Sequence, residues 1–200
     1  MAEQSSFHPY LNWAKQRIDE MDAALASLEA KSNQVKADSK VKSDQLIADM
    51  KKRRDEFQAT VKKQTDNSEA AWQRTKVQLE SQWKGYEAQL KTYFDTVGKQ
   101  LEQQQATFRS VAAAQAKAWR EAADKLQGEA AKTATTKRTE IDEAVKKMKA
   151  DAAEAQARLQ KLGSESWTAF SAALAESRKA FDKANNEVAS ALKRAAPAQR

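Results

Sequence analysis

Hydrophobic residues recur at steps of three and four along most of the chain, which predicts long amphipathic helices. Ile18, Met21, Leu25 and Leu28 begin the pattern, and it resumes at Leu46 after a largely polar stretch at residues 32–45. Such a row of apolar residues at heptad spacing is called a core seam below. The first helix is predicted at about residues 10–63, with Pro9 at a position that suits a helix start.

Two polar segments predict turns. Residues 64–69 can cap a new helix, and Gly128 to Thr136 combines a helix-ending glycine with β-branched threonines. The second and third helices are therefore predicted at about residues 68–127 and 136–194, followed by a frayed tail at 195–200. The residues expected in their core seam are Trp72, Leu79, Trp83, Tyr86, Leu90, Val97, Leu101, Phe108, Trp119, Leu126, Ile141, Val145, Met148, Leu159 and Leu162.

These helices predict an all-α fold, an elongated antiparallel coiled-coil bundle of three long helices in a single domain spanning residues 1–200. A four-helix variant, with an extra break near Gly163 or within residues 32–45, is the alternative. Gly85 and Gly98 lie inside the second helix, where each indicates a close helix approach or a weak point.

The amino-acid composition predicts a weak hydrophobic core for this bundle. The chain has 200 residues, of which 40 are alanine, and Leu, Ile, Val and Phe together make up about 15%. That share is below the roughly 20% at which a conventional globular core becomes doubtful. We therefore expect a homo-oligomer, a dimer or larger, or a partner surface that covers part of the core seam.

The net charge of +7 favours anionic partners. Basic residues are densest at residues 51–54 and in the last third of the chain. Acidic residues flank the first cluster, and four consecutive residues of a helix point in different directions, so an ordinary solvated helix face is the alternative to an anion-binding patch. Nucleic acid is the weaker of the anionic partners considered. The residues of the expected anion-binding patch are Lys51, Lys52, Arg53, Arg54, Arg178, Lys179, Lys193 and Arg194.

Residues that support catalysis are scarce. The chain has no cysteine, and its one histidine, His8, has no acidic residue at the spacing of a triad or a metal site. The four glycines are isolated, whereas phosphate-binding loops need clustered glycines. We expect no enzymatic activity, no metal and no cofactor.

Aromatic residues point to a possible surface contact. Trp and Tyr favour the boundary between apolar and aqueous phases, although filling a bundle core is their more common use in a helical protein. The first helix carries the best candidate for contact with a lipid or another apolar surface. The residues of this surface anchor are Phe7, Tyr10, Leu11, Trp13, Ile18 and Met21.

In its Ala-, Lys- and Glu-rich amphipathic helices, the chain resembles the apolipoprotein A/E-like proteins and the phasins that coat bacterial storage granules. The resemblance concerns composition and periodicity over most of the chain and carries over no functional residue. It implies reversible coating of a hydrophobic or anionic surface.

Three functions remain open at this point. The first is a self-associating scaffold or surface coat, which is lipid-binding or granule-binding. The others are a membrane-shaping helical dimer and a basic nucleoid-associated protein. With no signal peptide expected, the predicted location is the cytoplasm, at the periphery of a membrane or granule.

Overall fold

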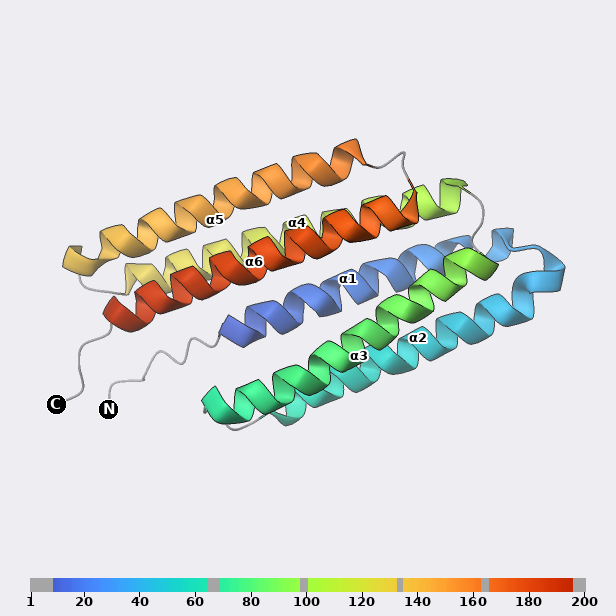
Figure 1. Cartoon of the computed structure of the whole chain (residues 1–200), viewed down its shortest axis with the longest axis horizontal. Helices are drawn as coiled ribbons and strands as arrows, with labels where there is room; N and C mark the ends of the chain where they lie inside the picture. Colours follow the sequence, from blue (N-terminus) through green and yellow to red (C-terminus); the bar gives the residue numbers. More distant parts are fainter. Residues whose placement is uncertain (1–8, 65–68, 98–100, 133–134, 163–165, 196–200) are drawn as a thin grey trace. The chain divides into compact units, whose positions relative to one another are not determined.

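The computed structural model describes residues 9–64, 69–97, 101–132, 135–162 and 166–195, without the side chains at positions 9, 69, 101 and 135–137. All regular elements within these ranges are helices, so the all-α prediction is confirmed there (Figure 1). The elements are α1 (Pro9–Lys31), the short 3-10 helix η1 (Ser32–Gln34), α2 (Ala37–Lys63), α3 (Glu69–Thr96), α4 (Leu101–Ala131), α5 (Thr135–Lys161) and α6 (Trp167–Ala195).

Each of the three long helices expected from the sequence is represented by two shorter ones. The helix expected over residues 10–63 is interrupted by η1 and by extended backbone at Val35 and Lys36, within residues 32–45, where the alternative prediction placed a break. No residue between Leu28 and Ser43 is buried, so this stretch has no apolar face to hold a continuous helix against a neighbour.

Each of the other two expected helices also corresponds to two helices of the structure. Residues 68–127 form α3 and the larger part of α4, and residues 136–194 form α5 and α6. Gly98 and Gly163 both lie outside the described residues. Gly128 lies inside α4, which ends three residues later at Ala131, so the second turn begins later than expected.

The chain divides into two compact units, where a single domain was expected. Unit A comprises residues 17–114, and unit B comprises residues 1–16 together with 115–200. Unit A therefore holds α2 and α3 with parts of α1 and α4. Unit B holds α5 and α6 with the remaining parts of α1 and α4.

Unit A has a core of large side chains and a buried polar cluster. Phe57, Leu79 and Tyr86 are buried, and the Tyr86 hydroxyl donates a hydrogen bond to the Met21 carbonyl oxygen at 3.0 Å. Burial raises the pKa of Tyr86, so its hydroxyl remains a donor at any ordinary pH. A second tyrosine, Tyr93, accepts a hydrogen bond from Gln103 Nε2 at 3.0 Å.

Unit B has a core with more alanine. Trp119 and Phe181 meet edge to face with their ring centroids 5.1 Å apart. Around them are Leu126, Ile141 and Val188 together with alanines from α4 and α6. Gln115 is buried among these helices, where it accepts a hydrogen bond from the Ser177 hydroxyl.

The helix layout repeats after 98 residues. α5 begins and ends 98 residues after α2, and α6 begins 98 residues after α3. The same shift carries α1 onto residues 107–129, which lie within α4, and carries the first residue of unit A, Arg17, onto Gln115, where unit B resumes. We call residues 9–96 the first repeat and 107–194 the second, and residues 98 positions apart are equivalent.

Residue types support this repeat. Because 98 is a whole number of heptads, equivalent residues share a heptad position, and many pairs are buried together. These pairs include Tyr10 with Phe108, Met21 with Trp119, Leu28 with Leu126, Ile47 with Val145, Met50 with Met148, Trp83 with Phe181 and Leu90 with Val188. Identities at exposed positions, where packing sets no constraint, are Asp44 with Asp142, Lys51 with Lys149, Glu56 with Glu154, Ala59 with Ala157 and Lys63 with Lys161.

Candidate functional site

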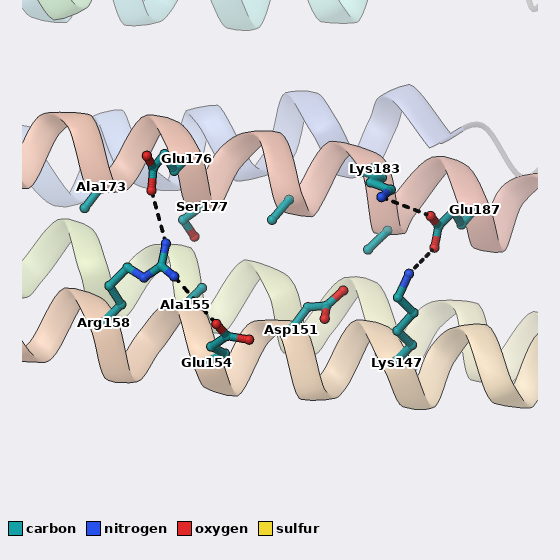
Figure 2. A pocket seen from close by; sticks show the side chains of 12 residues that line it. Lys147, Asp151, Glu154, Ala155, Arg158, Ala173, Glu176, Ser177, Lys183 and Glu187 are labelled. Atoms are coloured by element: carbon teal, nitrogen blue, oxygen red, sulfur yellow. Dashed lines mark hydrogen bonds and ion pairs between the residues drawn. The ribbon is translucent and has the colours of Figure 1, made fainter.

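A groove of about 300 Å³ lies between α5 and α6 in unit B (Figure 2). Its floor consists of small side chains, and α5 has no buried residue between Met148 and Leu159. The small residues that line it are Ala155, Ala173, Ser177, Ala180 and Ala184. Alanine at these positions leaves open the space that larger core residues would fill.

Charged side chains form the rim and link the two helices. At one end, Glu187 lies 3.1 Å from Lys147 Nζ and 4.0 Å from Lys183 Nζ. The hydrogen bond to Glu187, aided by its charge, raises the pKa of Lys147. At the other end, Arg158 lies 3.1 Å from Glu176.

Asp151 lies on the rim between these two ion-paired ends (Figure 2). Within the described part of the chain it makes no hydrogen bond or ion pair, although its charge adds slightly to the raised pKa of Lys147. Ser177, in contrast, donates its hydroxyl proton to Gln115. The groove therefore combines an apolar floor with one carboxylate available to a ligand, which suits binding of an amphipathic molecule.

A second feature of unit B is the segment of residues 9–16, which comes from the N-terminal part of the sequence. Asn12 Nδ2 donates a hydrogen bond to Asn185 Oδ1 at 3.1 Å, and Lys15 Nζ lies 2.6 Å from Glu121. The hydrogen bond from Lys15 lowers the pKa of Glu121. Residues 9–16 thus complete unit B, as the equivalent residues 107–114 contribute to unit A.

Most of the residues expected in the core seam are buried in the structure. Trp72, Val97 and Leu162 are half-buried, and the side chain of Leu101 lies outside the described residues. The buried members are Leu79, Trp83, Tyr86, Leu90, Phe108, Trp119, Leu126, Ile141, Val145, Met148 and Leu159.

The expected surface anchor does not face outward. Tyr10, Trp13 and Met21 are buried, and Ile18 is half-buried. Leu11 is exposed at 38%, and Phe7 lies outside the described residues, as does His8. These side chains are buried because the face of α1 that carries them packs against other helices of its units. Contact with a lipid would require the helices to separate.

Two of the four residues in the first half of the expected anion-binding patch form ion pairs within unit A. Lys51 pairs with Glu29, and Arg54 pairs with Asp22 and with Asp55. Lys52 is exposed. Arg53 lies over Gly85, where the Cβ of a larger residue would be 2.6 Å from its Nη1 atom.

The second half of that patch, in unit B, is similarly divided. Arg178 is buried, and Arg194 pairs with Glu140. Lys179 and Lys193 are exposed. Within each unit, acidic neighbours therefore neutralise part of the expected patch.

Sequence analysis missed the groove and the buried polar residues. A stretch of α5 with alanine at its inward positions looks like an ordinary continuation of the core seam. The signal that reveals the groove is the 98-residue repeat, in which Ala155 takes the place of Phe57. The buried polar residues, among them Gln115 and Asn185, carried no such signal, since the heptad pattern scores them only as gaps.

No family model, curated protein or solved structure matches this chain. The similarity to apolipoproteins and phasins thus rests on composition and periodicity alone. Among the described residues, no helix is both long and apolar enough to cross a membrane. Nor do the described side chains include a group of three or more His, Cys, Asp or Glu arranged to hold a metal ion.

Proposed function

We propose that this protein is a non-enzymatic, self-associating helical scaffold that coats an apolar or anionic surface. The observation that carries the proposal is the completion of unit B by residues 9–16, from the opposite end of the sequence. Each copy of the chain carries this segment and the site that receives it. A second copy can therefore supply the segment in place of the chain's own, which is domain exchange.

The contacts of this segment suit exchange between copies. Tyr10, Trp13 and Ala14 are buried, so the segment provides apolar area. The bonds Asn12 to Asn185 and Lys15 to Glu121 fix its register. Closure within one chain acts at an effective concentration in the millimolar range, so exchange is favoured when chains fold together at high concentration.

The coating role is supported by where the large apolar side chains lie. Among the described residues, the exposed large hydrophobic side chains are Leu11, Val41 and Val77. The aromatic faces are covered by other helices, and opening a unit would turn them toward an apolar surface. In this proposal the elongated helices pair antiparallel, and the protein acts in the cytoplasm at the periphery of a membrane or granule.

Cross-linking tests the self-association. The variant Asn12→Cys with Asn185→Cys places the two cysteines of this chain at a contact of 3.1 Å between the original side chains. We expect a short bis-maleimide to give monomers linked within the chain after refolding at low concentration. After refolding at high concentration, it should give dimers and larger species.

The single variant Asn12→Cys is the matched control, because it has no second cysteine at the contact. Dimers at equal yield from the single and double variants would show that collision, rather than exchange, links the chains. Links within the chain alone at all concentrations, with a monomer in sedimentation velocity, would contradict exchange.

A further inference from the structure

The groove between α5 and α6 has a filled counterpart in the first repeat. The equivalents of Ala155 and Ala184 are Phe57 and Tyr86, and these two aromatic side chains are 0% and 1% exposed. The equivalent of Ser177 is Leu79, which is 0% exposed. Two aromatic rings and a leucine side chain in unit A are thus replaced by much smaller groups in unit B.

The space left by these replacements is large enough for a ligand. The groove has a volume of about 300 Å³. An engineered protein cavity of about 150 Å³ accepts benzene, so the groove has room for about two rings. The alanine methyl groups of the floor offer such rings apolar contact.

One charged position at the rim is also reversed between the repeats. Asp151 is equivalent to Arg53, whose guanidinium lies over Gly85 on α3. The first repeat therefore has buried rings and a cation that lies over Gly85, all supplied by its own side chains. In the second repeat the ring positions are open, and an anion, Asp151, stands in place of Arg53 and belongs to neither ion pair at the ends of the rim. Lys183 stands in place of Gly85 and lies 4.0 Å from Glu187.

We propose that the groove between α5 and α6 binds a small aromatic molecule that carries an ammonium group. Its rings lie over Ala155 and Ala184, and its ammonium group lies beside Asp151. The ligand thereby replaces both the rings and the cation that the first repeat builds from its own sequence. This site does not depend on the self-association proposed above, since all its residues belong to α5 and α6 of unit B.

Calorimetric titration of the full chain with three naphthalene derivatives tests the proposal. The probes are 2-(1-naphthyl)ethylamine, its neutral alcohol analogue and 1-naphthylacetate. We expect the amine to bind most tightly at one site per chain and the carboxylate least tightly. Asp151→Asn should lower the affinity for the amine about fivefold and leave that for the alcohol unchanged.

The second part of the experiment fills the groove with a larger side chain. Ala155→Phe restores the side chain of the first repeat and should lower the affinity for all three probes at least tenfold. Ala153→Phe is the matched control, because Ala153 is exposed on the same helix and lies outside the groove lining. Ala155→Leu serves the same purpose if the phenylalanine variant fails to fold, as judged by circular dichroism.

Three results would overturn the assignment. The first is the absence of saturable binding of the amine to the unmodified chain. The second is an unchanged affinity when Ala155 is enlarged. The third is an equal loss for the amine and the alcohol in Asp151→Asn, which would remove the role of the carboxylate.

Discussion

Gly85 and Gly128 both lie inside helices, but their surroundings differ. A Cβ added to Gly128 would meet no atom within 4 Å, whereas one added to Gly85 would be 2.6 Å from Arg53 Nη1. Gly85 therefore leaves space that the Arg53 guanidinium occupies. Gly128 marks neither a contact nor the end of its helix.

Alanine at these two positions should have unequal effects. We expect Gly128→Ala to raise the free energy of unfolding by about 1 kcal/mol, since alanine favours the helix and meets no obstacle. Gly85→Ala gains the same propensity but must displace the Arg53 guanidinium, so its net gain should be smaller. Urea denaturation followed by circular dichroism measures both, and a destabilising Gly128→Ala would contradict the open surroundings.

Buried polar side chains distinguish otherwise similar helices. In unit B, Gln115 accepts the Ser177 hydroxyl and donates to the Leu174 carbonyl oxygen at 3.5 Å. In unit A, the equivalents of Gln115 and Ser177 are Arg17 and Leu79. The hydrogen bond between Gln115 and Ser177 can form only in unit B, so it favours one arrangement of the helices over others. A buried asparagine has the same effect in coiled coils.

A double-mutant cycle tests this role of Gln115. Gln115→Leu alone leaves the buried Ser177 hydroxyl without its acceptor and should cost about 1 to 3 kcal/mol in the free energy of unfolding. Ser177→Ala in the same background should recover much of that loss, because it removes the stranded hydroxyl. Additive losses in urea denaturation would show that the two side chains are not coupled.

The sequence predicts the helices themselves well, because heptad spacing is a local signal. Leu79, Trp83, Tyr86 and Leu90 are buried as their spacing indicates. The breaks are harder to predict. An eleven-residue step from Val35 to Leu46 is compatible with one continuous helix face, and only the absence of buried side chains from residue 29 to 42 shows why the chain turns there.

The 98-residue repeat is hard to recognise in the sequence because equivalent positions keep their burial but often differ in residue type. Met21 is equivalent to Trp119, and Ser43 is equivalent to Ile141, yet all four are buried. A comparison of residue types along the chain gives such pairs little weight. The groove could not be predicted for the same reason, since it exists only as a difference in side-chain size between equivalent positions.

At the scale of the whole molecule, the coating proposal requires that helices separate. Ser27 Oγ and Thr107 Oγ1, on α1 and α4, lie 2.9 Å apart within unit A. Cysteines at both positions would link these helices in a chain that has no other cysteine. Oxidation forms this disulfide and reduction breaks it, so one protein sample can be measured in both states.

Flotation with vesicles measures the effect of this link. We expect the reduced Ser27→Cys, Thr107→Cys variant to float with anionic vesicles and to shift its tryptophan emission to shorter wavelengths. The oxidised form should float less, because its aromatic face cannot open. The single variant Ser27→Cys should behave alike in both redox states.

Equal flotation of the two forms would show that unit A does not open on a surface, and no flotation of the unmodified chain would remove the coating role for lipid. Flotation with neutral vesicles distinguishes binding to an apolar surface from binding driven by charge. Salt-sensitive retention on DNA, with no response to vesicles, would favour the nucleic-acid alternative instead.

The completion of unit B by residues 9–16 also sets an order of folding. Unit A comprises one continuous segment, but the Asn12 to Asn185 bond joins residues 173 positions apart. Contacts of such long separation form late, because the loop between them must be closed first. Unit A can thus fold while the chain is still being synthesised, whereas Tyr10 and Trp13 wait uncovered until α6 has emerged. In that interval, a neighbouring finished chain can cover them first, so the rate of synthesis and local crowding of new chains would influence which assemblies form.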